Sequence, residues 1–190
     1  MRIVGGRHRG RRLVAPPGEG VRPTSDRARE ALFNILSHGR FAASGLPFAG
    51  KAVLDAFAGT GALGLEALSR GASAAVFIET EREALAALRH NIAALGEEDS
   101  AHIMAGDAIR PPRATMRCAA AFLDPPYGSG LAAPALAAVA AAGWLTEDAL
   151  AVLEIAAREP LPPPSGFSLI DERVYGAARL VFLRRDRREG

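Results

Sequence analysis

The sequence is poor in cysteine, nearly devoid of lysine and without a long apolar run. Among its 190 residues the one cysteine is Cys118, so an internal disulfide is excluded. No Cys/His cluster with metal-ligand spacing surrounds Cys118, and we expect a plain buried thiol and no bound metal. The longest nearly uncharged stretch, residues 131–145, contains Pro134 and Gly143 and is too short to cross a bilayer. No secretory signal is visible, and we expect a cytoplasmic protein without a membrane partner.

What remains is the composition of one ordinary globular domain. A chain of 190 residues, 49% of them hydrophobic, can bury a stable core without disulfide bonds or a structural metal. We expect a compact monomer in two parts. Residues 1–45 should form a small extension, a basic β-hairpin followed by a helix up to about residue 37, and residues 46–190 should form the main domain.

Positive charge is concentrated at the N-terminal end. Residues 1–29 hold eight arginines and two acids, a net charge of +6, whereas the whole chain carries +2. A basic segment on a mildly acidic body favours a polyanion such as nucleic acid, although charge alone leaves a solvated arginine-rich face open. The residues expected to contact RNA are Arg2, Arg7, Arg9, Arg11, Arg12, Arg22, Thr24 and Arg27.

From residue 51 onward, short apolar strands alternate with helices. Strands that are apolar throughout are typical of a parallel sheet covered by helices on both faces, an α/β fold. Ligands of such sheets bind outside the carboxyl ends of the strands, and four of these ends carry an acid. The acids are Asp55, Glu79, Asp107 and Asp124. Expected strands are 52–56, 74–78, 102–105, 119–123 and 149–155, expected helices are 62–70, 82–95 and 131–142, and residues 167–174 and 178–183 should form a terminal hairpin.

A glycine-rich turn between the first strand and its helix indicates a nucleotide-type cofactor. Gly59, Gly61 and Gly64 match G-x-G-x-x-G, and Glu79 lies where a ribose-binding acid is expected. Asp55 precedes this turn, where it would repel a pyrophosphate but suit the ammonium and sulfonium of S-adenosylmethionine. The sequence therefore favours S-adenosylmethionine over NAD. The expected cofactor contacts are Asp55, Phe57, Ala58, Gly59, Thr60, Gly61, Glu79, Asp107 and Ala108.

The segment Asp124-Pro125-Pro126-Tyr127 follows an apolar strand and suits a base amino group. Two prolines give a stiff loop that presents carbonyl acceptors without competing N–H donors. The Asp124 carboxylate and a loop carbonyl can hold both amino hydrogens and orient the nitrogen toward a methyl donor. Tyr127 offers a ring on which the base can stack. We expect Asp124, Pro125 and Tyr127 to form the catalytic pocket, with Asp124 acting as a base or only as an acceptor.

Several segments match one known family. They are Met1–Leu13, the run RPTSDR at residues 22–27 with residues 29–36, residues 55–71, and residues 124–127. Together they resemble the RsmD family of 16S rRNA guanine-N2 methyltransferases over nearly the whole chain. The resemblance implies a Rossmann-like class I methyltransferase with a mostly parallel seven-stranded sheet and a C-terminal antiparallel hairpin.

The same resemblance implies a reaction and its partners. The donor would be S-adenosylmethionine, and the substrate would be a guanine in 16S rRNA of the small ribosomal subunit. Asp55, Gly59, Gly61, Glu79 and Asp107 would fall on cofactor positions, and Asp124, Pro125 and Tyr127 on the target-base pocket.

Three alternatives stay open at this point. DNA adenine-N6 methyltransferases use the same Asp-Pro-Pro-Tyr motif, so the motif alone does not choose guanine. The glycine turn alone would also suit an NAD-dependent oxidoreductase. The basic segment alone would suit a non-catalytic RNA-binding protein.

Overall fold

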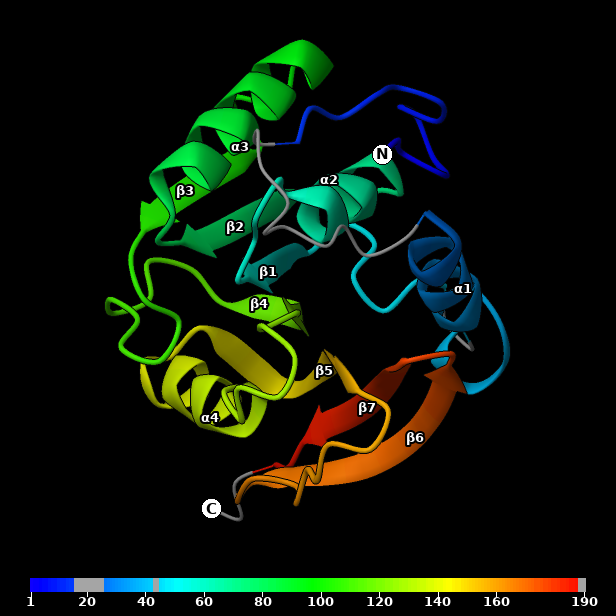
Figure 1. The fold of residues 1–190 in the computed structure, drawn as a ribbon, viewed down its shortest axis with the longest axis vertical. Coiled ribbons are helices and arrows are strands. Elements are labelled where there is room, and N and C mark those ends of the chain that lie inside the picture. Colours follow the sequence, from blue (N-terminus) through cyan, green and yellow to red (C-terminus); the bar gives the residue numbers. More distant parts are fainter. Residues whose placement is uncertain (16–25, 43–44, 188–190) are drawn as a thin grey trace.

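The computed structural model describes residues 1–15, 26–42 and 45–187 of the chain. Figure 1 shows a single sheet flanked by helices, with the N-terminal segment beside α2 and α3. The helices are α1 (Asp26–Leu36), the short 3₁₀ helix η1 (Gly39–Phe41), α2 (Ala62–Ser69), α3 (Arg82–Leu95) and α4 (Ala132–Ala141). The strands are β1 (Ala52–Ala56), β2 (Ala74–Glu79), β3 (Ala101–Ala105), β4 (Cys118–Leu123), β5 (Leu145–Ala156), β6 (Phe167–Tyr175) and β7 (Ala178–Arg185).

The seven strands form one mixed sheet in the order β3-β2-β1-β4-β5-β7-β6. β1 pairs in parallel with β2 and β4, and these two pair in parallel with β3 and β5. β7 is antiparallel to both β5 and β6. The predicted parallel sheet with a terminal antiparallel hairpin is therefore confirmed. The order reverses direction at β1, which places the ends of β1 and β4 at the topological switch point where α/β sheets bind ligands.

Two apolar layers cover the faces of the sheet. One contains Leu32 and Phe33 of α1, Leu65 of α2 and Leu88 of α3, packed on sheet residues that include Phe122. The other contains Leu136 and Val139 of α4 with Trp144, packed on the opposite sheet face. Three helices thus cover one face and α4 the other, and Figure 1 shows this division.

The N-terminal segment is simpler than two strands. Its antiparallel ladder is a single bridge between Arg2 and Arg12, flanked by backbone hydrogen bonds such as Ile3 N to Arg11 O at 2.9 Å. Positive-φ glycines at Gly6 and Gly10 turn the chain before a longer ladder can form. The hairpin is confirmed, whereas the two strands expected within it reduce to one bridge.

No helix within the described parts of the chain is long and apolar enough to span a membrane. The single cysteine is buried in the α4 layer. Burial raises the pKa of the Cys118 thiol to about 12, so the thiol stays protonated at neutral pH.

Candidate active site

Acids line the carboxyl edge of the sheet in strand order. Asp107 follows β3, Glu79 ends β2, Asp55 lies near the end of β1, and Asp124 follows β4. A fifth acid, Glu154, lies near the end of β5. The four predicted acids are thus brought to one edge, and the structure adds one that the sequence analysis missed.

Strand register places the acids of β2, β4 and β5 on the same sheet face. Ala56 is level with Ile78 and Leu123, and Leu123 is level with Leu153. The next residues along β2, β4 and β5 are Glu79, Asp124 and Glu154, and alternation turns them to the opposite face from their predecessors. Asp55, one residue before Ala56, also faces that side. It is the side covered by α1, α2 and α3.

Asp55 caps the helix that follows the glycine turn. Its Oδ2 accepts a hydrogen bond from the Gly64 N–H in the first turn of α2, at 2.8 Å, and its side chain is buried. Burial raises the pKa of Asp55 well above its ordinary value of 3.8, and the nearby carboxylates of Asp124 and Glu79 raise it further. The Gly64 hydrogen bond lowers this pKa only in part. The position where a helix would hold a phosphate is therefore filled by a carboxylate.

Glu79 organises the other side of the same turn. Its Oε2 accepts from the Gly59 N–H at 2.7 Å, and its Oε1 accepts from the N–H groups of Thr80 at 2.7 Å and Glu81 at 2.8 Å. Glu79 is nearly buried, with 8% of its surface exposed. Backbone amides that could bind an anion are occupied by carboxylates, and the turn presents negative charge instead.

The turn is close-packed against β1 and β2. A Cβ on Gly64 would overlap the ring of Phe77 and lie 3.2 Å from the Asp55 Cβ, so only glycine allows α2 to approach the sheet this closely. Phe57 adopts a left-handed φ of 64° directly after β1, an unfavourable conformation that the surrounding packing must hold. The predicted strand, turn and helix are thus brought together as a tight unit.

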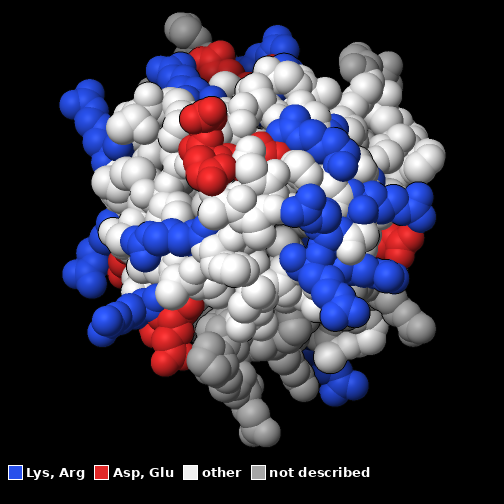
Figure 2. Space-filling model, turned by 90° about the horizontal axis from the view of Figure 1, so that it is seen from above, with Lys and Arg blue, Asp and Glu red and all other residues white. Residues whose placement is uncertain are grey.

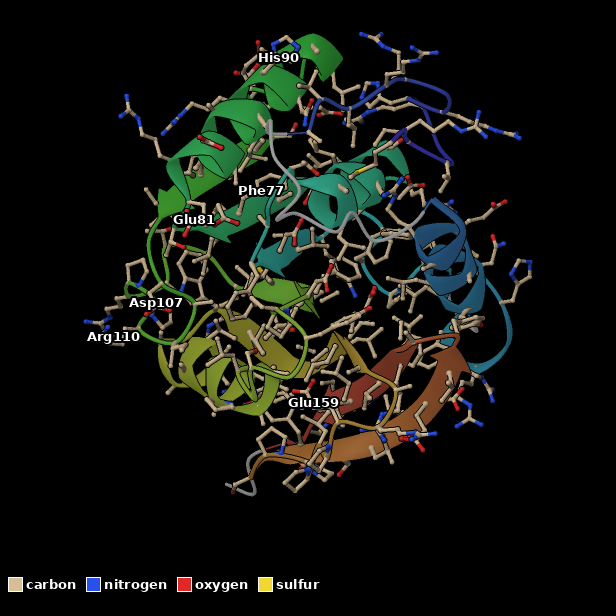
Figure 3. All side chains as sticks on the ribbon, viewed as in Figure 1. Phe77, Glu81, His90, Asp107, Arg110 and Glu159 are labelled. Atoms are coloured by element: carbon tan, nitrogen blue, oxygen red, sulfur yellow. The ribbon has the colours of Figure 1, made fainter. Side chains whose placement is uncertain are left out.

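The remaining predicted cofactor residues lie around this unit. Ala58 and Ala108 are buried. The Asp107 Oδ1 accepts from the Ile109 N–H at 2.9 Å, and its Oδ2 lies 3.7 Å from the Arg110 Nε, an exposed pair labelled in Figure 3 in the loop after β3. The Thr60 hydroxyl is directed to the Met1 Sδ at 3.6 Å, away from the turn's open side.

Two carboxylates from the end of β5 hold the loop after β4. Pro125 is buried and Tyr127 is 38% exposed. The Tyr127 hydroxyl donates to Glu154 Oε1 at 2.7 Å. The Gly128 N–H donates to Glu159 Oε2 at 2.9 Å, and Glu159 is labelled in Figure 3 just past β5. The expected pocket residues therefore sit on an anchored loop next to Asp55.

Comparisons with known proteins agree with this architecture. A family model described as "Conserved hypothetical protein 95" matches residues 1–184. "Ribosomal RNA small subunit methyltransferase D" of Escherichia coli (strain K12) is 38% identical over 179 residues, which cover 93% of this chain and 85% of that protein. The protein of the same name from Haemophilus influenzae is 34% identical over 181 residues, 93% of this chain and 89% of its own.

The chain belongs to the RsmD family. A solved structure from Escherichia coli, described as the methyltransferase yhhF, has a TM-score of 0.81 at 36% identity and is matched over 98% of each chain. The family resemblance inferred from the sequence is therefore confirmed, and so is the methyltransferase fold.

In this RsmD-family chain, part of the N-terminal arginine cluster is used internally. The Arg7 guanidinium donates to both oxygens of Glu97, at 2.5 and 2.7 Å, and the His8 Nε2 lies 2.5 Å from Glu97 Oε1. Both partners lower the pKa of Glu97, against the burial that raises it. The Arg11 guanidinium donates to the carbonyl of Ala94 near the end of α3.

The arginines of the RsmD-family hairpin are nevertheless on the surface, Arg7 included. Arg2, Arg9, Arg11 and Arg12 are exposed. Figure 2 shows Lys and Arg side chains gathered on the side of the molecule where the hairpin lies. The predicted contacts Arg22 and Thr24 lie outside the described residues, as does the side chain of Arg27. The RNA contacts of all these residues stay a prediction.

Three residues that the sequence analysis missed attach the hairpin to α2, to α3 and to the segment just after α3. The buried Glu66 of α2 accepts from the Val4 N–H at 2.8 Å and from the Arg70 Nε at 2.6 Å. Asn91 of α3, 1% exposed, accepts from the Val14 N–H at 2.8 Å and donates to the Val14 and Thr60 carbonyls, both at 3.0 Å. Glu97 is the third. Their partners in the hairpin lie 62 to 90 residues away in the chain, so local periodicity gave no signal for them.

Proposed function

We propose that this chain transfers a methyl group from S-adenosylmethionine to the exocyclic N2 of a guanine in 16S rRNA of the small ribosomal subunit. The observation that carries the proposal is one continuous row of acids at the sheet edge. In this row the capped glycine turn of Asp55 and Glu79 lies directly beside the strand end that bears Asp124. A donor site and an acceptor site are therefore adjacent.

The donor side suits a cationic ligand. S-adenosylmethionine, when bound, supplies a methyl group activated by a positively charged sulfur. The buried Asp55 carboxylate would attract its ammonium and sulfonium, and Glu79 would accept from ribose hydroxyls. Asp107, two residues past β3, would accept from the adenine amino group. A pyrophosphate would instead meet Asp55 at the helix N-terminus and be repelled.

The acceptor side suits a planar amino group. Such a nitrogen is a weak nucleophile because its lone pair is delocalised into the ring. Asp124 and the Pro125 carbonyl would accept its two hydrogens and direct the lone pair toward the donor methyl, an orientation effect that lowers the barrier. Asp124 or water would take the proton released after transfer. The base would have to leave its stack and rest on the Tyr127 ring.

RNA is favoured over DNA by two observations. The exposed arginines of the hairpin offer phosphate contacts on the side of α2 and α3, which suits recognition of a folded RNA by shape and phosphates. The relatives that it matches over most of their length are named as rRNA small subunit methyltransferases.

The decisive experiment is tritiated methyl transfer from S-adenosylmethionine to small ribosomal subunits purified from a strain that lacks the mark. We expect incorporation, and nucleoside mass spectrometry should identify the product as N2-methylguanosine. Duplex DNA serves as the parallel substrate. Incorporation into DNA as N6-methyladenine, without incorporation into the subunits, would replace the proposal by the DNA alternative. No transfer to either would leave the non-catalytic RNA-binding alternative.

Calorimetry separates the two cofactor classes. We expect S-adenosylmethionine to bind and NADH to give no measurable heat, because Asp55 and Glu79 occupy the amides that a pyrophosphate needs. Binding of NADH in preference to S-adenosylmethionine would contradict the donor assignment and favour an oxidoreductase.

A further inference from the structure

Glu154 is a buried acid with no assigned role in the proposed methyl transfer. It is 7% exposed and lies in β5, a strand whose neighbouring residues Val152, Leu153 and Ile155 are apolar and buried. Its partner in β7 is Leu180, which belongs to the apolar layer under α1, α2 and α3. An apolar side chain would pack there equally well, whereas a buried carboxylate is unfavourable unless a donor compensates it.

The Tyr127 phenol is such a donor. Its hydroxyl lies 2.7 Å from Glu154 Oε1, within the range of a strong hydrogen bond to a carboxylate. Tyr127 itself is 38% exposed, so one end of the side chain is fixed in the interior while the ring remains open to a ligand. This hydrogen bond joins the buried Glu154 of β5 to the exposed Tyr127 in the loop after β4.

The prolines of the loop do not fix the orientation of the Tyr127 ring. Pro125 and Pro126 restrict the backbone, and Glu159 holds the Gly128 N–H at 2.9 Å. None of these fixes the side-chain torsions of Tyr127. A ring that must order itself when a base arrives loses conformational entropy at that moment, which weakens capture.

We propose that Glu154 is a positioning residue for base capture: it holds the Tyr127 ring in place beside Asp124, so that the acceptor base meets a preset stacking surface. The inference rests on the proposed function, since it assumes that a base is the ligand of this pocket. Register supports it, because Leu123 and Leu153 are paired and the residues that follow them, Asp124 and Glu154, therefore face the same side.

The test uses single and double variants on whichever nucleic acid the wild-type chain methylates. We expect Tyr127→Phe and Glu154→Ala each to lower kcat roughly ten-fold, the loss of about one hydrogen bond to a charged group. The KM for the nucleic acid should change less than about two-fold, because phosphate contacts dominate affinity. The double variant should lose no more than the stronger single variant, since both remove the same contact.

Rescue distinguishes positioning from bulk stability. Glu154→Gln keeps an acceptor for the phenol and should retain at least half of the wild-type kcat, whereas Glu154→Ala should not. The affinity for S-adenosylmethionine, measured by calorimetry, should stay within two-fold in all variants. Tyr127→Phe removes the contact from its exposed end and tests the inference even if Glu154→Ala unfolds.

Matched controls come from the same elements. Glu147→Ala removes an exposed glutamate at the opposite end of β5, and Tyr175→Phe removes the hydroxyl of the other tyrosine, which is 39% exposed. Both should leave kcat unchanged. Wild-type kcat in Tyr127→Phe, or losses that multiply in the double variant, would overturn the inference while leaving methyl transfer intact. Transfer to DNA alone would instead contradict the proposed function.

Discussion

The carboxyl edge of the sheet and the N-terminal hairpin both concentrate charge of one sign, but they balance it differently. At the sheet edge, the carboxylates of Asp55 and Glu79 are held by backbone N–H groups, and that of Glu154 by a phenol. In the hairpin, Arg7 is held by the full charge of Glu97 and Arg11 by the α3 carbonyl of Ala94. Neutral donors bring no compensating positive charge to the edge, whereas ion pairing with Glu97 cancels charge in the hairpin.

This difference matches two roles: the acids of the sheet edge suit ligand binding, and the paired arginines attach the hairpin to the rest of the fold. Acids fixed by amides keep a negative potential that can attract a cationic ligand. Arginines paired with acids or carbonyls lose part of their attraction for phosphate and serve to hold the hairpin on α2 and α3. Exposed arginines such as Arg9 and Arg12 are therefore the better candidates for contact with a polyanion. Substitutions at both regions test this difference, with the largest effect expected at Asp124.

Asp124→Ala tests the acid edge at its acceptor end. Loss of the carboxylate that orients the amino group should lower kcat by roughly 10²- to 10⁴-fold, the contribution typical of a positioned acid or base. The affinity for S-adenosylmethionine should remain nearly unchanged by calorimetry. Asp99→Ala, an exposed acid beyond α3, is the control and should behave as wild type. A large loss of donor affinity in Asp124→Ala would assign Asp124 to the cofactor site instead.

Glu66→Ala tests the contacts that attach the hairpin to α2. Glu66 and Arg29 are fully buried, and the Arg29 Nε lies 3.8 Å from a Glu66 carboxylate oxygen. The Nε of the partly buried Arg70 lies 2.6 Å from the other oxygen. Removing the acid leaves buried positive charge, which should lower the free energy of unfolding by about 3–5 kcal/mol in urea titrations. The exposed Glu98→Ala should change it by less than about 0.5 kcal/mol. An equal effect of both would mean that the buried cluster contributes nothing to the attachment.

Asp55→Asn tests the acid edge at its donor end. Losing one charge-assisted contact should weaken S-adenosylmethionine binding about 10- to 100-fold. The raised pKa of Asp55 means that the folded protein binds this proton more tightly than the unfolded chain does, so its stabilising effect is present at low pH and is lost as pH rises through the raised pKa. Asp55→Asn should therefore stabilise the unliganded protein at neutral pH, and the gain should vanish toward pH 3.8.

The same linkage predicts a pH-dependent donor affinity. A cationic ligand favours the carboxylate, so binding releases a proton wherever Asp55 is protonated, and affinity should rise with pH until the raised pKa is passed. Asp55→Asn should remove this part of the dependence. Calorimetry in two buffers of different ionisation enthalpy measures the released proton. Equal proton release by wild type and Asp55→Asn would contradict the assignment.

Arg9→Gln and Arg12→Gln test the exposed arginines with the smallest effect. Each phosphate contact contributes about 0.7–0.9 to the slope of log K against log salt, and four contacts among the predicted arginines would give about −3 to −4. Each variant should make the slope shallower by about that unit, and Arg7→Gln by less, because Glu97 already holds Arg7. Filter binding at several salt concentrations measures it. A flat wild-type slope would mean that these arginines are solvated and do not contact phosphate.

Sequence patterns predicted the parts of the site that follow directly from strand ends. Asp55, Asp107 and Asp124 each come where an apolar run stops, and Glu79 ends the second strand, so the row of acids and the glycine turn were foreseeable. Glu154 was missed because it lies within an apolar strand, before Ile155, and β5 continues to Ala156. Nothing in the local pattern marks an acid whose partner is a phenol on the neighbouring loop.

The contacts that attach the hairpin could not be predicted from the sequence, for a different reason. The arginines of residues 1–12 are alike in the sequence and exposed in the structure, yet Arg7 is paired with Glu97. Only the tertiary fold brings Glu97, just beyond α3, within reach and so decides which arginine is paired with an acid. The division into residues 1–45 and 46–190 also stays a prediction, and the apolar residues Ile3 and Leu13 belong to the same core as α2 and α3.

Asn91 limits how far this extension can be treated as a separate module. One buried amide joins Val14 of the hairpin to the Thr60 carbonyl of the glycine turn. Aspartate would lack the two donors and leucine would lack all polar atoms, so neither could replace it without stranding buried backbone groups. A graft of the basic hairpin onto another methyltransferase would therefore need this asparagine in the host, because its amide is the link between Val14 and the glycine turn.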